Sequence, residues 1–321
     1  MPDIHEFTNY KNRKTGFSNL DEKCGSLYPG LYVVGAISSL GKTTFLLQLA
    51  DQIAESGIDI LYFSLEMAAS ELISKTISRY TYKLCKGKTN NAKTITGINT
   101  ASRYKNYSLE EKRLIDEAIA AYAVFAEHIY IYEGIGNIGV EQIKEAVKEH
   151  IELTGRVPVI FIDYLQILAT YDMRSSDKQN TDKSVLELKR LSRDYKTPVV
   201  AISSFNRDNY ISEVNTAAFK ESGAIEYGSD VLIALQPQGM KPGYTAKDQK
   251  YNAALTKQCK ASKQRNVEIV ILKNRNGKTN GKVGFTYYSL FNCFAPDFGF
   301  TPADWEPVDD EDDIIPFGAD S

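Results

Sequence analysis

The sequence predicts an α/β domain with a mostly parallel, twisted sheet, helices on both faces of that sheet and a β-hairpin near the C-terminus. Short apolar runs rich in β-branched and aromatic residues alternate with amphipathic helical patterns along most of the chain. This alternation is typical of a parallel sheet. A Gly- and Asn-rich turn between the last two strand patterns predicts the hairpin. With 321 residues, the chain is long enough for one large domain of this class.

Each expected element has its own segment. The expected strands, all of them predicted to be buried, are Leu31–Ala36, Ile60–Ser64, His128–Tyr132, Val157–Asp163, Val199–Ser203, Val231–Leu235 and Val267–Lys273. The expected helices are Lys42–Ser56, Ala69–Tyr82, Leu109–Ala126, Gly139–Thr154 and Thr181–Tyr195. The hairpin continues through a turn at 274–280 into a last strand at Gly281–Tyr288. Three polar or basic stretches, 83–107, 206–222 and 236–266, are expected to be irregular.

The composition is that of an ordinary globular protein, with 43% hydrophobic and 25% charged residues. No run approaches the ~18 consecutive apolar residues of a membrane helix. The N-terminus lacks the apolar core of a signal peptide, so a cytoplasmic protein is expected. The four cysteines are far apart and none has CxxC spacing, which argues against a zinc site or a disulfide framework.

The net charge of −3 hides an asymmetry along the chain. Lys282 is the last basic residue, and nine of the 41 acidic residues follow it. The first 282 residues therefore carry 38 basic and 32 acidic side chains. A mildly basic body is compatible with nucleic acid without establishing it. The acidic stretch from about Ala295 is expected to be an extended tail.

The first strong chemical signal is the segment from Ala36 to Thr44, AISSLGKTT, which follows a strand pattern and opens a helical one. It meets the phosphate-binding pattern G-x-x-x-x-G-K-[ST], except that Ala36 stands in the first Gly position. Backbone N–H groups of such a loop surround phosphate oxygens, and the helix dipole favours their negative charge. Lys42 is expected to reach the β- and γ-phosphates, and the Thr43 hydroxyl to bind Mg²⁺. The candidate nucleotide-binding residues are Ala36, Ser38, Ser39, Leu40, Gly41, Lys42, Thr43 and Thr44.

Two acidic residues follow other strand patterns. One apolar strand ends in Asp163, which is a candidate to hold Mg²⁺ directly or through water. Glu66 comes just after another strand and is a candidate base that polarises the attacking water. The carboxyl ends of parallel strands form the ligand crevice of an open α/β sheet, so the two carboxylates are expected to converge. The alternatives are a plain strand-terminal Asp and a Glu favoured by a helix N-terminus.

Six segments, in the same order, resemble the C-terminal motor domain of DnaB-type replicative helicases. They are GLYVVGAISSLGKTT, YFSLEM, IDYLQIL, AISSFNR, FKESGAIEYGSD and LKNRNGKTNGKV, and TGFSNLDEKCGSLYPG upstream resembles the start of that domain. The resemblance implies a RecA-like core, a ring hexamer that binds ATP and Mg²⁺ between subunits, and movement on single-stranded DNA. It divides the chain into an N-terminal arm (1–15), an ATPase motor domain (16–294) and an acidic tail (295–321).

The resemblance also implies roles for single residues. Lys42 and Glu66 would be catalytic within their own subunit, whereas Lys273 and Arg275 would reach the γ-phosphate from a neighbouring subunit. A planar guanidinium stabilises the charge that spreads over the transferred phosphoryl group. The alternative for Arg275 is a solvated turn residue. In the region 206–225, which resembles the family's central DNA-binding loops, the candidate DNA-binding residues are Arg207, Lys220, Glu221 and Gly223.

The sequence departs from the family pattern in three places. Ser204 stands where the family has the glutamine that senses the γ-phosphate, and its reach is shorter. The loop Asp208–Phe219 contains two acidic residues and no basic one. Only about 15 residues precede the motor, so the family's N-terminal domain is expected to be absent. These departures keep open a second function, an ATPase that assembles or loads replication proteins without unwinding DNA.

Two further segments leave alternatives open. Residues 236–266 carry seven basic side chains against one acidic, and would be either an outer DNA contact or a plain insertion. The acidic run before Pro316 and Phe317 resembles the tips of bacterial single-strand binding proteins, which dock replication partners. The alternative for this run is a solubilising tail.

Overall fold

In the computed structural model, residues 13–297 are described, apart from 86–88, 135–136, 170, 172–173, 207–209, 220–221 and 280. Within this part, nine strands form one sheet in the order β3-β2-β4-β5-β1-β6-β7-β8-β9. The strands are β1 (Gly30–Ala36), β2 (Ile60–Ser64), β3 (Ile129–Glu133), β4 (Val159–Asp163), β5 (Pro198–Ser204), β6 (Val231–Pro237), β7 (Gln264–Asn274), β8 (Lys282–Tyr288) and β9 (Cys293–Pro296). The first six strands run parallel to one another, and the pairs β6–β7, β7–β8 and β8–β9 are antiparallel, which confirms the expected sheet and its terminal hairpin.

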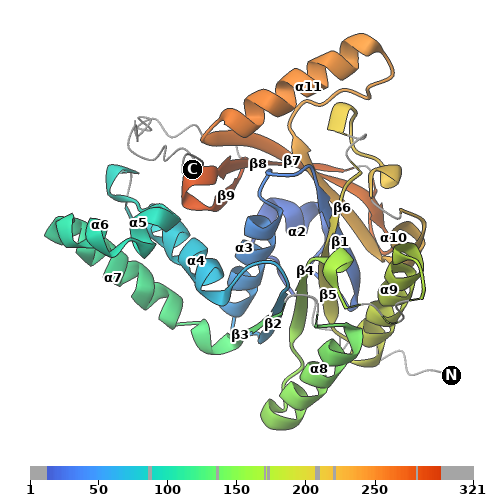
Figure 1. Cartoon of the computed structure of the whole chain (residues 1–321), viewed down its shortest axis with the longest axis horizontal. Coiled ribbons are helices and arrows are strands. Elements are labelled where there is room, and N and C mark those ends of the chain that lie inside the picture. The colour runs from blue at the N-terminus through green and yellow to red at the C-terminus, as the bar shows by residue number, and fades with distance from the viewer. Residues whose placement is uncertain are drawn as a thin grey trace, which may run out of the picture.

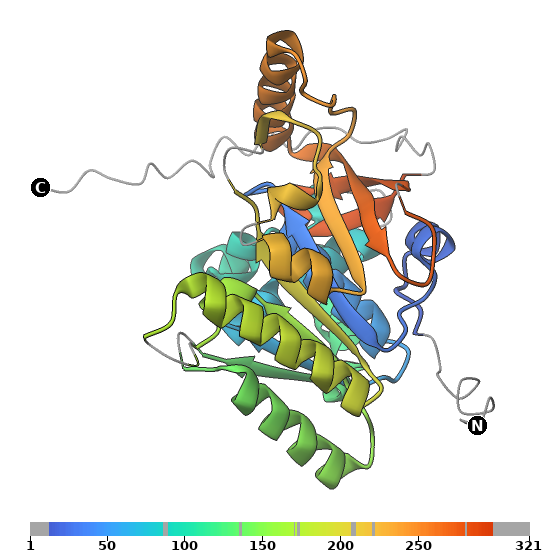
Figure 2. The ribbon, with the colours of Figure 1, turned by 90° about the vertical axis from the view of Figure 1, so that its right-hand side faces the viewer.

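Helices cover both faces of the sheet, as Figures 1 and 2 show. The helices are α2 (Ser18–Cys24), α3 (Lys42–Ala54), α4 (Ala69–Leu84), α5 (Ile95–Asn99), α6 (Ala101–Asn106), α7 (Leu109–Ala123), α8 (Val140–Thr154), α9 (Asp177–Asp194), α10 (Ser222–Gly228) and α11 (Ala246–Ala261). α3, α4 and α7 lie on one face, and α8, α9 and α10 on the other. No helix in the described part is long and apolar enough to cross a membrane.

Burial of the strands follows their place in the sheet. Every residue of β1, β2 and β4 is buried, because both faces of these central strands are covered. β3 was expected to be buried as well, and this was wrong: its first four residues are only half-buried and the last is exposed. The reason is its position, since β3 is the edge strand of the sheet.

The stretches expected to be irregular contain helices. α11 lies within 236–266 and α5 and α6 within 83–107, whereas α10 only begins at the last residue of 206–222. The apolar periodicity that predicts helices is missing from α11 because the buried side chains of its inner face are Asn252, Thr256 and Cys259. α5, α6 and α10 are too short to show a period. α2 and β9 were not expected either.

The parallel strands end at one common edge. Ala36 at the end of β1 lies opposite Ser204 of β5 and Leu235 of β6, and Ser64 at the end of β2 lies opposite Asp163 of β4. β7 runs in the opposite direction and ends beside the start of β6. The chain that follows β1, β2, β4 and β5 therefore emerges at the carboxyl edge, and the end of β7 lies at the amino edge.

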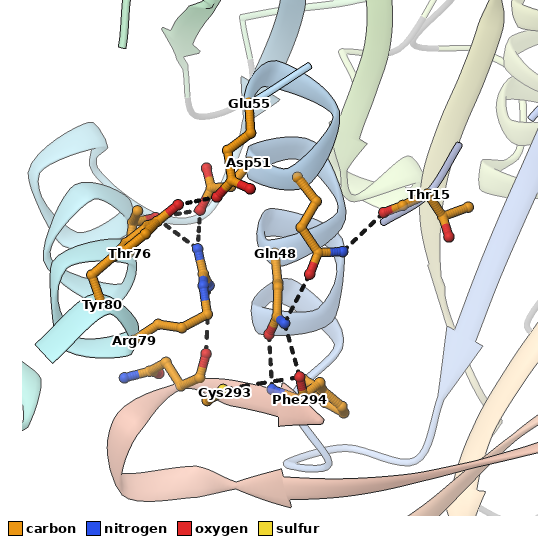
Figure 3. A network of polar contacts seen from close by, with 11 residues as sticks. Thr15, Gln48, Asp51, Glu55, Thr76, Arg79, Tyr80, Cys293 and Phe294 are labelled. Atoms are coloured by element: carbon orange, nitrogen blue, oxygen red, sulfur yellow. Dashed lines mark hydrogen bonds and ion pairs between the residues drawn. The ribbon is translucent and has the colours of Figure 1, made fainter. Parts of the chain in front are cut away.

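A buried polar network holds α3, the helix that follows β1, against its neighbours (Figure 3). Arg79 of α4 is 1% exposed and forms an ion pair with Asp51 of α3. The Thr76 hydroxyl donates to the same carboxylate at 2.7 Å. One turn earlier on α3, the Gln48 amide exchanges two hydrogen bonds of 2.8 Å with the backbone of Phe294 in β9. These contacts fix the orientation of α3 about its own axis.

Replacing Arg79 with Met should strongly destabilise the protein, because it leaves the Asp51 carboxylate buried without its cation. Burial already raises the pKa of Asp51, and Arg79 acts in the opposite direction. The loss expected for breaking such a pair is about 3–5 kcal/mol. Urea unfolding measures it. The matched control Arg113→Met removes an exposed arginine of α7 and should cost under about 1 kcal/mol. Equal midpoints for the two variants would contradict the account.

Candidate nucleotide site

The loop between β1 and α3 has the conformation that a phosphate-binding loop needs. Gly41 precedes the helix with φ +90°, a left-handed conformation that favours glycine. A Cβ at Gly41 would also lie 2.7 Å from the ring of Tyr287 in β8, so only glycine fits there. The hydroxyls of Tyr287 and Thr44 share a hydrogen bond. Ser38 and Ser39 are exposed, whereas Ala36 and Leu40 are buried.

The four residues predicted to handle the triphosphate come together at the carboxyl edge. The Thr43 hydroxyl donates a hydrogen bond to Asp163, and the charges of Lys42 and Glu66 both act on that carboxylate. Burial lowers the pKa of Lys42, while Asp163 and Glu66 act in the opposite direction. The convergence predicted for Glu66 and Asp163 is therefore present.

Backbone contacts between β2 and β4 position the two carboxylates. The N–H of Leu65 donates to the carbonyl oxygen of Asp163 at 2.9 Å, so the chain that carries Glu66 is tied to the end of β4. The Ser64 hydroxyl donates to the carbonyl of Met67 at 2.5 Å and folds the chain around Glu66. Glu66 itself is exposed.

Asp163 is an unusual carboxyl group. Its side chain is buried, and Oδ2 has no hydrogen-bond partner among the described residues. Burial raises its pKa from the ordinary value of 3.8 to about 6, partly offset by the hydrogen bond from Thr43. An unpaired buried carboxylate is costly, and a divalent cation offsets that cost. The hydroxyl of Thr43 and the free oxygen of Asp163 are thus chemically suited to hold Mg²⁺.

Lys75 of α4 is a site residue that the sequence analysis missed. Its Nζ lies 3.5 Å from the Thr44 hydroxyl and 3.2 Å from Oδ1 of Asn292. Burial lowers its pKa, and Asp163 acts in the opposite direction. A second cation therefore lies beside the phosphate loop. No motif marks it, because it comes from a helix face and not from a strand end.

The predicted basic pair lies at the opposite edge of the sheet. Lys273 is in β7 beside the start of β6, where its Nζ donates to the carbonyls of Glu226 at 2.5 Å and Ser229 at 2.7 Å. Arg275 follows β7, is about half-exposed, and its Nε lies 3.5 Å from Oδ1 of Asp230. The seven residues of β1 separate this edge from the phosphate loop by roughly 20 Å. Arg275 does not reach the phosphate loop of its own chain.

Ser204 lies at the carboxyl edge, next to Gln166. The Ser204 N–H donates to Oε1 of Gln166 at 3.2 Å, and Nε2 of Gln166 donates to the Ser203 hydroxyl at 2.9 Å. Gln166 follows β4 in the 3₁₀ turn Leu165–Ile167, so it connects the ends of β4 and β5. The role of Ser204 as a sensor stays a prediction.

Three predicted DNA-binding residues, Arg207, Lys220 and Glu221, lie outside the described residues. Gly223 is in the first turn of α10. Tyr210 belongs to the same region of the chain. Its hydroxyl accepts a hydrogen bond of 3.3 Å from the N–H of Ser38 in the phosphate loop. The candidate DNA loop therefore touches the nucleotide site directly, a contact that no local sequence signal indicates.

The match to known families covers most of the chain. A family model, the DnaB-like helicase C terminal domain, matches residues 13–296. The chain belongs to this family. The replicative DNA helicase DnaB of Helicobacter pylori is 25% identical over 322 residues, which cover 92% of this chain and 59% of the relative. The replicative DNA helicase DnaC of Bacillus subtilis is 28% identical over 289 residues, which cover 88% of this chain and 56% of the relative. The chain thus spans a little over half the length of these curated relatives.

Solved structures share the fold. A solved ATPase domain matches with a TM-score of 0.73 at 20% identity, covering 91% of this chain and 95% of that one. A DnaB-like replicative helicase, solved with its interactions with primase, matches with a TM-score of 0.72 at 22% identity, covering 91% and 64%. These likenesses confirm the expected RecA-like α/β core.

Asp163→Asn should stabilise the nucleotide-free protein at pH 8. The folded-state pKa of Asp163 lies above its ordinary value. The stabilising contribution of this group is therefore complete below about pH 4 and lost as the pH rises through about 6. The neutral amide avoids that loss, which is roughly 1–3 kcal/mol.

Thermal unfolding at pH 5 and pH 8 in EDTA measures this difference. The variant should gain over the wild type mainly at pH 8. The matched control Asp116→Asn changes an exposed residue of α7 and should respond equally at both pH values. If the wild type were at least as stable as Asp163→Asn at pH 8, the ionised Asp163 carboxylate would not destabilise the folded protein and the account would be wrong.

Proposed function

We propose that this chain is an ATP-driven motor of the replicative DnaB helicase type, which hydrolyses ATP between subunits of a ring and moves on single-stranded DNA. The observation that carries the proposal is the gathering of Lys42, Thr43, Glu66 and Asp163 at one edge of the sheet. Membership of the DnaB-like helicase C-terminal family supports it, as do the replicative helicases among the relatives.

Each residue of this group has a distinct task in the proposed reaction. The loop amides and Lys42 bind the β- and γ-phosphates, aided by the dipole at the start of α3. Thr43 and Asp163 would hold Mg²⁺, which would supply positive charge to the triphosphate. Glu66 is exposed beside them and accepts a proton from the attacking water. Lys75 adds a second positive charge near Thr44.

The ring is part of the proposal because the predicted trans-acting cation lies at the wrong edge to serve its own subunit. Arg275 is at the amino edge, where its half-exposed guanidinium can point toward another subunit. Lys273 is held by the carbonyls at the end of α10, which favours a role in placing Arg275 over direct contact with phosphate. In a head-to-tail ring, each amino edge would face the carboxyl edge of the next subunit.

Coupling between ATP and DNA is proposed to run through Tyr210. Its hydroxyl already binds the phosphate loop at Ser38, so a bound triphosphate and the candidate DNA loop affect each other there. This route would replace the family's glutamine at the position of Ser204. The absence of that glutamine favours the second candidate function, an ATPase that assembles or loads replication proteins without unwinding. Docking of a partner on the acidic tail stays a prediction.

ATPase turnover with and without single-stranded DNA, followed by strand displacement on a forked duplex, tests the proposal. Stimulation by DNA together with unwinding is the expected result. Stimulation without unwinding would favour the loading function, and no turnover in either condition would overturn both.

Glu66→Gln separates chemistry from binding in the same assay. It should keep nucleotide binding but lower turnover by about 10²–10⁴-fold, because it removes the proton acceptor alone. Lys42→Ala serves as the comparison and should weaken nucleotide binding itself. Full turnover in Glu66→Gln would remove this residue from the mechanism.

A further inference from the structure

α11 projects beyond the sheet at its carboxyl edge, away from the helices on both faces (Figures 1 and 2). The Thr245 hydroxyl caps its start by accepting from the Asp248 N–H at 3.1 Å. Its buried side chains are Asn252, Thr256 and Cys259, and Leu255 packs against the core beside them. Ten of the 16 residues of the helix are exposed, so it presents a broad outer surface.

The outer face of α11 is basic. Lys247, Lys250 and Lys257 are exposed, and their spacing of three and seven residues places them on one side of the helix. None of the three pairs with a carboxylate of the described residues, in contrast to Lys144 of α8, whose Nζ lies 2.6 Å from Glu187. The three charges are therefore available to a ligand, and their common sign selects a polyanion.

Aromatic rings accompany these lysines. Tyr251, on α11, is 43% exposed, and Tyr244, just before it, is 91% exposed. The Lys241 ammonium lies 4.4 Å from the centroid of the Tyr251 ring. Exposed rings beside cations are the arrangement that binds single-stranded nucleic acid, because bases stack on the rings while the cations contact phosphates. The charge of an acidic peptide would be bound by the lysines alone, and the bases of a duplex are already stacked on each other. The exposed rings therefore favour a single strand over both.

The inner face of α11 holds the candidate DNA loop. Asn252 is fully buried, and its Nδ2 donates to the carbonyls of Ile211 at 3.0 Å and Lys241 at 2.8 Å. The Lys260 ammonium lies 5.5 Å from the ring centroid of Tyr210 in the same loop. One helix thus presents cations on its outer side and contacts Tyr210 and Ile211 of the loop on its inner side.

The end of α11 also leads to the nucleotide site. Arg265, four residues after the helix, donates to the carbonyl of Ser39 in the phosphate loop at 2.7 Å. Its guanidinium lies 5.6 Å from the ring centroid of Tyr287, which packs against Gly41. A ligand on α11 would therefore act on both the DNA loop and the phosphate loop.

We propose that the outer face of α11 is a second binding site for single-stranded nucleic acid, in which Lys247, Lys250 and Lys257 contact phosphates and Tyr251 stacks on a base. The site rests on the proposed function, since it extends the path of the strand that the motor holds. It lies outside the loops that resemble the family's DNA-binding region. It would supply the basic side chains that the loop 208–219 lacks.

Salt dependence of oligo(dT) binding tests the site. Each phosphate contact to a single strand contributes about 0.7 to the slope of log K against log salt. The triple variant Lys247→Gln, Lys250→Gln and Lys257→Gln should lower that slope by about 2, and weaken binding most at low salt. Fluorescence anisotropy of labelled oligo(dT), with full-length protein and a non-hydrolysable ATP analogue, measures both. ATPase turnover without DNA should be unchanged.

A charge-matched control uses exposed basic residues of α8 and α9. Lys148→Gln, Lys178→Gln and Arg193→Gln remove the same charge from helices away from α11 and should leave the slope nearly unchanged. Equal slopes for the two triple variants, with oligo(dT) still bound, would overturn the α11 site and leave the proposed function standing. A wild-type protein that does not bind oligo(dT) at all would overturn both.

Tyr251 separates stacking from charge. Tyr251→Ala should weaken oligo(dT) binding about tenfold, whereas Tyr251→Phe keeps a ring and should bind like the wild type. If the lysine variant lost affinity for a blunt duplex but not for oligo(dT), the single-strand assignment would be wrong. If Phe and Ala at 251 weakened binding equally, stacking would be excluded and the proposal as stated would fail.

Discussion

The shared direction of β1, β2, β4 and β5 is the constraint on which the rest of the structure depends. Because these strands end at one edge, the phosphate loop, Glu66 and Asp163 lie together there. The same direction places Arg275, which follows the antiparallel β7, at the far edge. Under the proposed function, Arg275 could therefore reach a phosphate loop only in another copy of the chain. The sheet thus gathers Lys42, Thr43, Glu66 and Asp163 at one edge and leaves Arg275 at the other.

Much of this arrangement is predictable from the sequence, because central parallel strands are buried on both faces and appear as continuous apolar runs. β1, β2 and β4 show this plainly, and the residues after their ends can be assigned to one crevice. The loop around Gly41 is also predictable from the sequence, because a left-handed glycine and a following helix are local requirements. The site residues that are predictable from the sequence are therefore those placed by the direction of a strand or by a local turn.

The features that escaped prediction depend on tertiary contacts. α11 buries Asn252, Thr256 and Cys259 and so has no apolar period to reveal it. Lys75 faces the phosphate loop only because α4 is fixed to α3 by the buried pair of Arg79 and Asp51. The hydrogen bond from Ser38 to Tyr210 joins residues 172 positions apart. The last of these contacts ties the nucleotide site to the candidate DNA loop.

Action between subunits is the central claim, and mixing two inactive variants tests it most directly. Arg275→Ala removes the cation from one edge, and Lys42→Ala removes the phosphate-binding lysine from the other. In mixed rings, some interfaces pair an intact Arg275 with an intact Lys42. The account predicts that ATPase turnover of the mixture partly recovers above that of either variant alone. A mixture that forms rings yet stays as inactive as its components would contradict it.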